Sequence, residues 1–264
     1  MRIEKVTTIS CGWALPDAAS HGTCIALHGP EGAILVDAAG DVAQGLAAAS
    51  ELDALQAIYL THEHTDHLWG LPGLLHALRF AGSREVLTIK GPPGAIHRAR
   101  AAVRAFELDP PYSLEWAPLE VTEGGDGLAT WAPTEHTVPT LAYRFDDVVV
   151  CGDTAPSSHV SALARGAGLL LHEASHDDAT RTGPHGHSTP AEAGRTAAEA
   201  SVGALCLTHI HPSLARARAV ELAAAEFSGP ILAPVDGDVL HRDGPSWSLH
   251  GQGVPQAGKA RNIR

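Results

Sequence analysis

The sequence predicts an α/β protein in which two mixed sheets are flanked by helices. Short apolar runs rich in β-branched residues alternate with alanine-rich stretches of helical period. Many of the strands look antiparallel, and helices accompany them in both halves, which favours a layered sandwich over a doubly wound parallel sheet. No proline- or serine-rich linker divides the chain. Residues 1–250 are therefore expected to form a single domain, and the polar residues 251–264 a C-terminal tail.

The first half is expected to begin with strands and then to alternate helices with strands. The strands are predicted at residues 3–9, 23–28, 33–37, 57–60, 85–89, 113–119 and 128–132. The helices are predicted at residues 41–51, 70–81 and 93–106. A hairpin turn is expected at Gly29–Gly32, and Pro72 is tolerated because it falls near the first turn of a helix. Gly124–Gly127, with three glycines in four residues, is expected to be only a turn.

The second half is expected to open with two strands, 140–146 and 147–151, that meet at Asp146 and Asp147. A regular alternation of helices and strands follows. The helices are predicted at residues 157–165, 189–201 and 214–226, and the strands at residues 168–171, 204–208 and 230–233. The strand at 230–233 is the last predicted element.

Composition excludes several classes of protein. The chain is 44% hydrophobic and 18% charged, with a mean hydropathy of -0.01, which is typical of a globular domain and not of a disordered or coiled-coil protein. The net charge of -12 argues against broad binding to polynucleotide phosphates. No apolar run approaches the roughly 20 residues of a membrane helix. Residues 1–5 lack the apolar segment of a secretory signal, so we expect a cytoplasmic protein without membrane association.

The charge is distributed unevenly along the chain. Between Arg79 and Arg104, six basic residues and the single acid Glu85 give +5, whereas the remainder of the chain carries -17. At helical spacing, His97, Arg100 and Arg104 fall on one face. This face could guide an anionic substrate, although a solvated helix is the favoured interpretation. The cysteines are too widely spaced for a zinc knuckle or a disulfide framework and are predicted to be small buried hydrophobes: Cys11, Cys24, Cys151 and Cys206.

Histidines point to the chemistry, because the chain has 17 of them and imidazole is the commonest metal ligand. A run of six residues, His62-Glu63-His64-Thr65-Asp66-His67, follows a buried strand. An extended backbone would project His62, His64 and Asp66 to one side, and His67 would face a second ion as the chain turns into a helix. Four such ligands can hold two ions about 3.5 to 4 Å apart. A surface loop of histidines is the alternative.

The pattern His62-x-His64-x-Asp66-His67 resembles the signature of the metallo-β-lactamase superfamily, and the similarity covers roughly residues 1–240. The resemblance implies a four-layer αβ/βα sandwich and a dinuclear centre. One ion would bind the first two histidines and a third, the other the aspartate, the next histidine and a last one, with a further aspartate between the ions. The residues that match these later ligands are His136, Asp153 and His209. Zinc is the expected metal, with manganese and iron as alternatives.

Other segments are similar to ribonuclease Z and its phosphodiesterase relatives. They are Gly70–Leu75, Tyr143–Phe145, Leu171–Ala174 and Gly186–Thr189. The resemblance implies that His187 contacts the phosphate or protonates the leaving oxygen; alternatively, it is an incidental neighbour of a helix cap at Ser188 or Thr189. Asp66 is expected to orient a metal-bridging hydroxide, and Glu173 to orient His187 or a metal-bound histidine. Four histidines are left without a role: His172, His176, His185 and His211.

The chain also departs from ribonuclease Z. That family carries a tRNA-gripping arm between the third histidine and the bridging aspartate, whereas here sixteen residues separate His136 from Asp153 and two strands use them all. The glycine-rich turn is altered to Cys11–Trp13, and Ile210–Pro212 replaces the usual residues after the last histidine. We therefore expect a dinuclear metal-dependent phosphodiesterase acting on a small or cyclic phosphodiester or a short oligonucleotide, with weak action on precursor tRNA.

Two other classes of function remain open. The same metal site could hydrolyse a lactone, a β-lactam, a thioester or a sulfate ester. The chain could also be a non-catalytic, metal-stabilised binding protein, although such proteins usually lose ligands. Oxygen-handling diiron members resemble His-x-Glu-x-Asp-His, where this chain has His64. The substrate, the physiological metal and the oligomeric state, including a homodimer, are left open.

Overall fold

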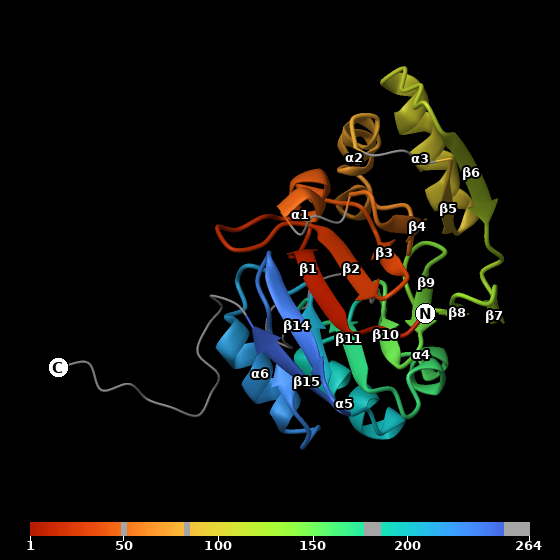
Figure 1. The fold of residues 1–264 in the computed structure, drawn as a ribbon. Helices are drawn as coiled ribbons and strands as arrows, with labels where there is room; N and C mark the ends of the chain where they lie inside the picture. Colours follow the sequence, from red (N-terminus) through yellow and green to blue (C-terminus); the bar gives the residue numbers. More distant parts are fainter. Residues whose placement is uncertain (49–51, 82–84, 177–185, 251–264) are drawn as a thin grey trace.

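The computed structural model describes residues 1–48, 52–81, 85–176 and 186–250. The predicted tail at 251–264, His185, and the end of the predicted helix 41–51 lie outside these residues. The chain folds into two mixed sheets that pack face to face, with helices on both outer faces (Figure 1). The predicted α/β sandwich of two mixed sheets flanked by helices is confirmed. In the described ranges, no helix combines the length and apolar character needed to span a bilayer.

The first sheet, within the described residues, has eight strands in the order β15-β14-β1-β2-β3-β4-β5-β6. Its strands are β1 (Lys5–Cys11), β2 (Thr23–Gly29), β3 (Gly32–Val36), β4 (Leu55–Tyr59), β5 (Val86–Gly91), β6 (Ser113–Pro118), β14 (Asp238–Asp243) and β15 (Ser246–His250). Strands β3 to β6 run parallel, so their carboxyl ends meet at one edge. The helices on this side are α1 (Val42–Ala48), α2 (Leu71–Leu78) and α3 (Pro93–Ala105).

The second sheet has seven strands in the same described ranges, in the order β13-β12-β11-β10-β9-β8-β7. They are β7 (Gly124–Gly125), β8 (Thr130–Pro133), β9 (Leu141–Phe145), β10 (Val148–Val150), β11 (Leu169–Glu173), β12 (Leu205–Thr208) and β13 (Ile231–Leu232). Strands β10 to β13 run parallel and again bring their carboxyl ends to one edge. The helices on this side are α4 (Ser158–Leu163), α5 (Pro190–Ala200) and α6 (Arg216–Ala224).

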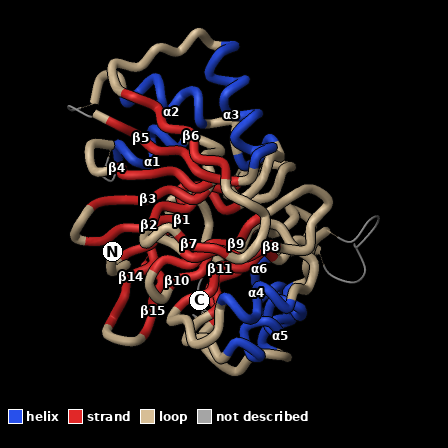
Figure 2. Tube along the Cα trace, turned by 90° about the vertical axis from the view of Figure 1, so that its right-hand side faces the viewer, coloured by secondary structure: helices blue, strands red, loops and turns tan. Residues whose placement is uncertain are grey.

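Apolar side chains fill the three spaces between the four layers. The space between the sheets holds Tyr59 from the first sheet against Tyr143 and Phe145 from the second, at ring-centroid distances of 5.2 and 5.0 Å. Figure 2 shows α1–α3 and α4–α6 on opposite sides of the sheets. A separate apolar cluster lies under each set of helices. Each fully buried side chain of this size stabilises the fold by about 1.5–3 kcal/mol. The loops at the carboxyl edges therefore rest on a rigid base. All four cysteines are buried and free, as predicted.

The glycine-rich segment is not only a turn. Gly124 and Gly125 form the short strand β7, which pairs with β8, while Asp126 and Gly127 make the turn. A Cβ at Gly124 would lie 2.7 Å from the ring of Trp131, so the missing side chain lets the two strands approach. The carboxylate of Asp126 also accepts a hydrogen bond from the Tyr59 hydroxyl. This interaction ties the second sheet to the first.

The hairpin of β14 and β15 was not among the predicted elements. Its strands contain few apolar residues, and His241, Arg242 and Asp243 interrupt any clean alternation. The hairpin forms because β14 pairs with the first part of β1, from Lys5 to Thr8. A strand defined by its partner in this way leaves little local signal, which is why the predicted strands stop at 233.

Candidate metal centre

The candidate ligands come from loops at the carboxyl ends of strands in both sheets. His62 and His64 follow β4, and Asp66 lies in the short 3-10 helix η1 (Thr65–His67). Three further side chains come from the second sheet, where His136 follows β8, Asp153 follows β10 and His209 follows β12. Residues separated by nearly 150 positions are thus brought together. The site exists only when both sheets are folded.

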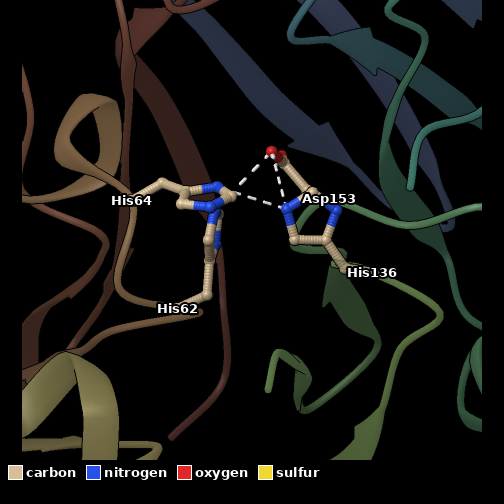
Figure 3. A group of neighbouring side chains, drawn as sticks. All are labelled: His62, His64, His136 and Asp153. Carbon is tan, nitrogen blue, oxygen red and sulfur yellow. Dashed lines mark hydrogen bonds and ion pairs between the residues drawn. The ribbon is translucent and has the colours of Figure 1, made fainter. Parts of the chain in front are cut away.

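The side chains form two groups, and a third group joins His187 to Asp153 and His209. Ligand atoms of His62, His64, His136 and Asp153 lie within 4.8 Å of one another, and so do those of Asp66, His67 and His209. In Figure 3 the first group converges from two sides, two histidines from the loop after β4 and two residues from the second sheet. The expectation that an extended backbone projects His62, His64 and Asp66 to one side is wrong. Because η1 begins at Thr65, the extended backbone stops before Asp66, which joins the other group.

Asp153 belongs to the first group and also lies close to the histidines of the second. Its Oδ2 atom is 3.7 Å from Nε2 of His62 and 3.6 Å from Nε2 of His209, and its Oδ1 atom is 3.5 Å from Nε2 of His67. The side chain is nearly completely buried. Burial raises the pKa of Asp153, but the charges of His209, His67 and His62 outweigh it, so the pKa lies well below its usual range. A carboxylate in this position is able to contact two cations at once.

The donor set fits metal ions. The Nε2 atoms of His62 and His67 are buried and lack a hydrogen-bond partner among the described residues, although they face a polar cluster. A buried imidazole nitrogen without a partner costs free energy, which a cation would remove. Imidazole nitrogens together with carboxylate oxygens are also the ligands that zinc accepts. We conclude that the residues present suit divalent cations.

Asp37 orients two candidate ligands and was not singled out from the sequence. It directly follows β3, and its Oδ2 atom accepts a hydrogen bond from Nδ1 of His67 at 2.7 Å. It also accepts from the backbone nitrogen and hydroxyl of Thr61, which lies 3.0 Å from Nδ1 of His62. Asp37 has a φ of 61°, a strained value for a residue other than glycine. The available signal was a carboxylate at the carboxyl end of a buried strand.

Glu173 and Ser175 support the last ligand in a similar way. The hydroxyl of Ser175 lies 3.0 Å from Nδ1 of His209 and donates to Glu173 at 2.8 Å. His209 has a φ of 53°, so the chain turns sharply at the end of β12. Ser175 was also missed, because its role depends on a residue 34 positions away.

His187 lies at the edge of the cluster, and its side chain is 26% exposed. Its Nδ1 atom is 2.9 Å from Oε1 of Glu173 and 3.9 Å from Oδ2 of Asp153. Burial lowers the pKa of His187, but the hydrogen bond and charge of Glu173 and the charge of Asp153 outweigh it and raise the pKa to about 9. The helix cap belongs to Thr189, whose side chain accepts from Glu192 in a capping box. His187 takes no part in that cap.

The other unassigned histidines within the described residues lie outside the two groups. His172 is buried and faces the helices, and its Nδ1 atom donates to the carbonyl oxygen of Glu173. His176 and His211 pack against Trp13, at ring-centroid distances of 5.5 and 4.5 Å. The structure therefore brings His209, and not His211, to Asp66 and His67.

The sequence of the chain agrees with this geometry. Residues 33–210 match a family described as Beta-lactamase superfamily domain. The chain belongs to this superfamily. Ribonuclease Z of Mycobacterium sp. (strain KMS) is 34% identical over 274 residues, covering 90% of this chain and 95% of the relative. Ribonuclease Z of Mycolicibacterium paratuberculosis is 33% identical over 282 residues, covering 92% and 99%. The chain thus falls in the ribonuclease Z-like branch of the superfamily.

Solved structures share the fold of this superfamily. The metallo-β-lactamase fold protein YhfI from Bacillus subtilis superposes with a TM-score of 0.78 at 24% identity, covering 90% of this chain and 99% of that chain. The short form of human tRNase Z gives a TM-score of 0.71 at 21% identity, covering 89% and 98%. The four-layer sandwich is therefore the metallo-β-lactamase fold, and the protein is a metal-dependent hydrolase.

Proposed function

We propose that the protein is a dinuclear phosphodiesterase that acts on a small or cyclic phosphodiester or a short oligonucleotide. The observation that carries this proposal is the position of His187, which Glu173 holds beside Asp153 at the edge of the ligand cluster. An imidazole placed beside two cations suits a phosphate whose leaving oxygen needs a proton. The proposal also takes residues 1–250 as one domain.

Seven residues would hold the ions. His62, His64 and His136 would bind one ion; Asp66, His67 and His209 would bind the other; Asp153 would lie between the two. Zinc is the metal that this donor set suits best, with manganese or iron as alternatives. When bound, two such cations supply a water that is acidic enough to ionise near neutral pH, and they neutralise charge on the phosphate.

The residues of the chain then divide the proton transfers between them. Asp66 would orient the attacking water and accept its proton. Burial raises the pKa of Asp66, but the hydrogen bond from His209 and the charges of His67 and His209 keep the pKa below its usual value, so the acid is present as carboxylate. His187 would donate a proton to the leaving oxygen from its ring, which Glu173 holds in place through Nδ1. Glu173 is thus a positioning residue.

The experiment compares substrate classes on one preparation. Protein loaded with zinc or with manganese is assayed on bis(p-nitrophenyl) phosphate and on panels of lactones, β-lactams, thioesters and sulfate esters. We expect the phosphodiester to be hydrolysed with the highest kcat/KM. A higher kcat/KM on any of the other panels would overturn the proposal in favour of that reaction.

A further inference from the structure

A groove lies between helix α3 and the end of strand β6. It has a volume of about 240 Å³, and its walls are Pro93, Ile96, His97, Arg100, Arg104 and Pro118. His97, Arg100 and Arg104 are exposed, and α3 contains no acidic residue. The chain as a whole carries a net charge of -12, so a cationic groove here is a marked local exception. The face that the helical spacing predicts is therefore the wall of a groove.

The groove opens at the same edge of the first sheet as the metal centre. Strands β4, β5 and β6 are parallel neighbours, and neighbouring strands lie about 4.8 Å apart. Pro118 ends β6, so it lies roughly 10 Å along the edge from the end of β4, where the metal loop begins. Gly94, in the first turn of α3, packs directly against the Glu63 carboxylate, between His62 and His64 in the chain. The metal loop and the groove are therefore in contact.

The charges around the groove favour an anion. Glu63, in the metal loop, is paired with Arg98, with 3.4 Å between Oε1 and Nη2, whereas Glu120 is exposed two residues beyond Pro118. The guanidinium of Arg100 lies over the ring of Trp116, 6.0 Å from its centroid, which restricts its position. Glu107 and Asp109 follow the helix beyond Arg104. The positive charge of the groove thus comes from Arg100 and Arg104, in the second half of α3.

The dimensions favour a chain of phosphates over a single small ligand. Arg100 and Arg104 are four residues apart, which is roughly 6 Å along the helix axis. The volume of the groove is below the roughly 300–1,000 Å³ of a usual small-molecule pocket. A shallow groove with cations spaced along it contacts successive phosphates of a backbone and leaves the bases outside.

We propose that this groove binds the backbone phosphates of a single-stranded oligonucleotide whose scissile phosphodiester lies at the metal centre. The inference rests on the proposed phosphodiesterase and narrows its substrate to chains that extend beyond the cleaved bond. Binding is independent of base sequence, because arginine and histidine contact only phosphates here.

Binding is tested with a fluorescein-labelled, 12-nucleotide phosphorothioate oligouridylate, whose linkages resist cleavage. Fluorescence anisotropy gives its Kd between 50 and 200 mM NaCl for the metal-loaded protein. In R100A/R104A we expect a higher Kd and a slope of log Kd against log salt that is smaller by about 1.4, because each phosphate contact contributes roughly 0.7. R100K/R104K should retain most of the slope.

The matched control is R195A/R218A, which removes two exposed arginines from α5 and α6 and changes the net charge equally. Its slope should equal that of the wild type, and it should hydrolyse bis(p-nitrophenyl) phosphate normally. Two results would overturn the proposal that the groove binds phosphates: equal losses of affinity in the two double variants, or wild-type binding that does not depend on salt. If the wild type does not hydrolyse bis(p-nitrophenyl) phosphate, only the proposed function is overturned, since anisotropy measures oligonucleotide binding independently of hydrolysis.

Discussion

Glu173 and His187 share a hydrogen bond of 2.9 Å between Oε1 and Nδ1. Because an ionised carboxylate only accepts, Nδ1 carries the proton and the orientation of the ring is restricted. Glu173 is completely buried and also accepts a hydrogen bond from the backbone nitrogen of Thr154 at 2.9 Å. The pair is therefore in place before any substrate binds.

Replacing His187 tests whether this pair serves the leaving group. In His187→Ala we expect kcat/KM on an alkyl phosphodiester to fall about 10²-fold or more, the usual scale for a positioned acid. The loss should be smaller for p-nitrophenolate, which leaves without protonation. Metal content, measured by plasma mass spectrometry, should stay unchanged. A variant that loses a metal would show instead that His187 is a ligand, which its distance from Asp153 and His209 would allow.

Removing the ions should both inactivate and destabilise the protein. We expect two metal ions per chain in the loaded protein, and a lower Tm after treatment with a chelator, because ions that bind only the folded state stabilise it. Asp153→Asn should bind fewer than two ions, since the affected carboxylate lies between the groups. A metal-replete crystal structure with His136 or His209 beyond about 3 Å from any ion would contradict the assignment, because zinc bonds are about 2.0 to 2.2 Å.

Asp37→Asn should weaken metal binding without removing a ligand. The carboxylate holds His67 and, through Thr61, His62, and loss of such a partner typically costs 10- to 100-fold in affinity. Competition with a chromogenic chelator measures the zinc Kd. Asp41→Asn is the matched control, because Asp41 is exposed and lies four residues away. Equal Kd values in the two variants would exclude the role assigned to Asp37.

Precursor tRNA should be a poor substrate. The sixteen residues between His136 and Asp153 form β9, β10 and their connections, so no room is left for an inserted arm. We expect slow and unselective cleavage of a labelled precursor tRNA by the purified protein, compared with a 12-nucleotide single strand. Efficient cleavage at the tRNA 3′ end would show that another surface replaces the arm.

His28 should make stability depend on pH. Burial lowers the pKa of His28 to about 3, and the charge of Lys5 adds to this, whereas an unfolded histidine has a pKa of about 6.5. Between these pH values unfolding takes up a proton. The contribution of His28 to the free energy of unfolding is therefore complete above pH 6.5 and falls as the pH decreases toward 3, by at most about 1.4 kcal/mol per pH unit. Urea unfolding of His28→Gln should show a smaller slope. The surface variant His159→Gln should keep the wild-type slope.

The strands that the sequence predicts correctly carry their own apolar signal. Ala57–Leu60 is a continuous apolar run, and the structure has β4 at Leu55–Tyr59. In contrast, β14 depends on pairing with β1, which begins more than 230 positions earlier in the chain. No local pattern reports such a partner, so the hairpin is absent from the predicted elements.

In the candidate site, too, the residues with a local signal could be predicted and those that depend on distant partners could not. The six-residue run from His62 to His67 is local and could be recognised directly. Asp37 is 30 residues away from His67, and its contribution depends on the parallel pairing of β3 with β4. The direction of the Asp66 side chain could not be predicted, because the start of a 3-10 helix at Thr65 depends on the packing of the loop.

Because the two groups of candidate ligands take side chains from both sheets, each ion, once bound, would also connect the halves of the molecule. His62 and His64 belong to one half, and His136 and Asp153 to the other. Linkage is reciprocal, so any coupling between the packing of the sheets and metal binding acts equally in both directions. We then expect substitutions at Tyr59 or Phe145, whose rings pack against each other between the sheets, to change the zinc Kd as well as the stability of the fold.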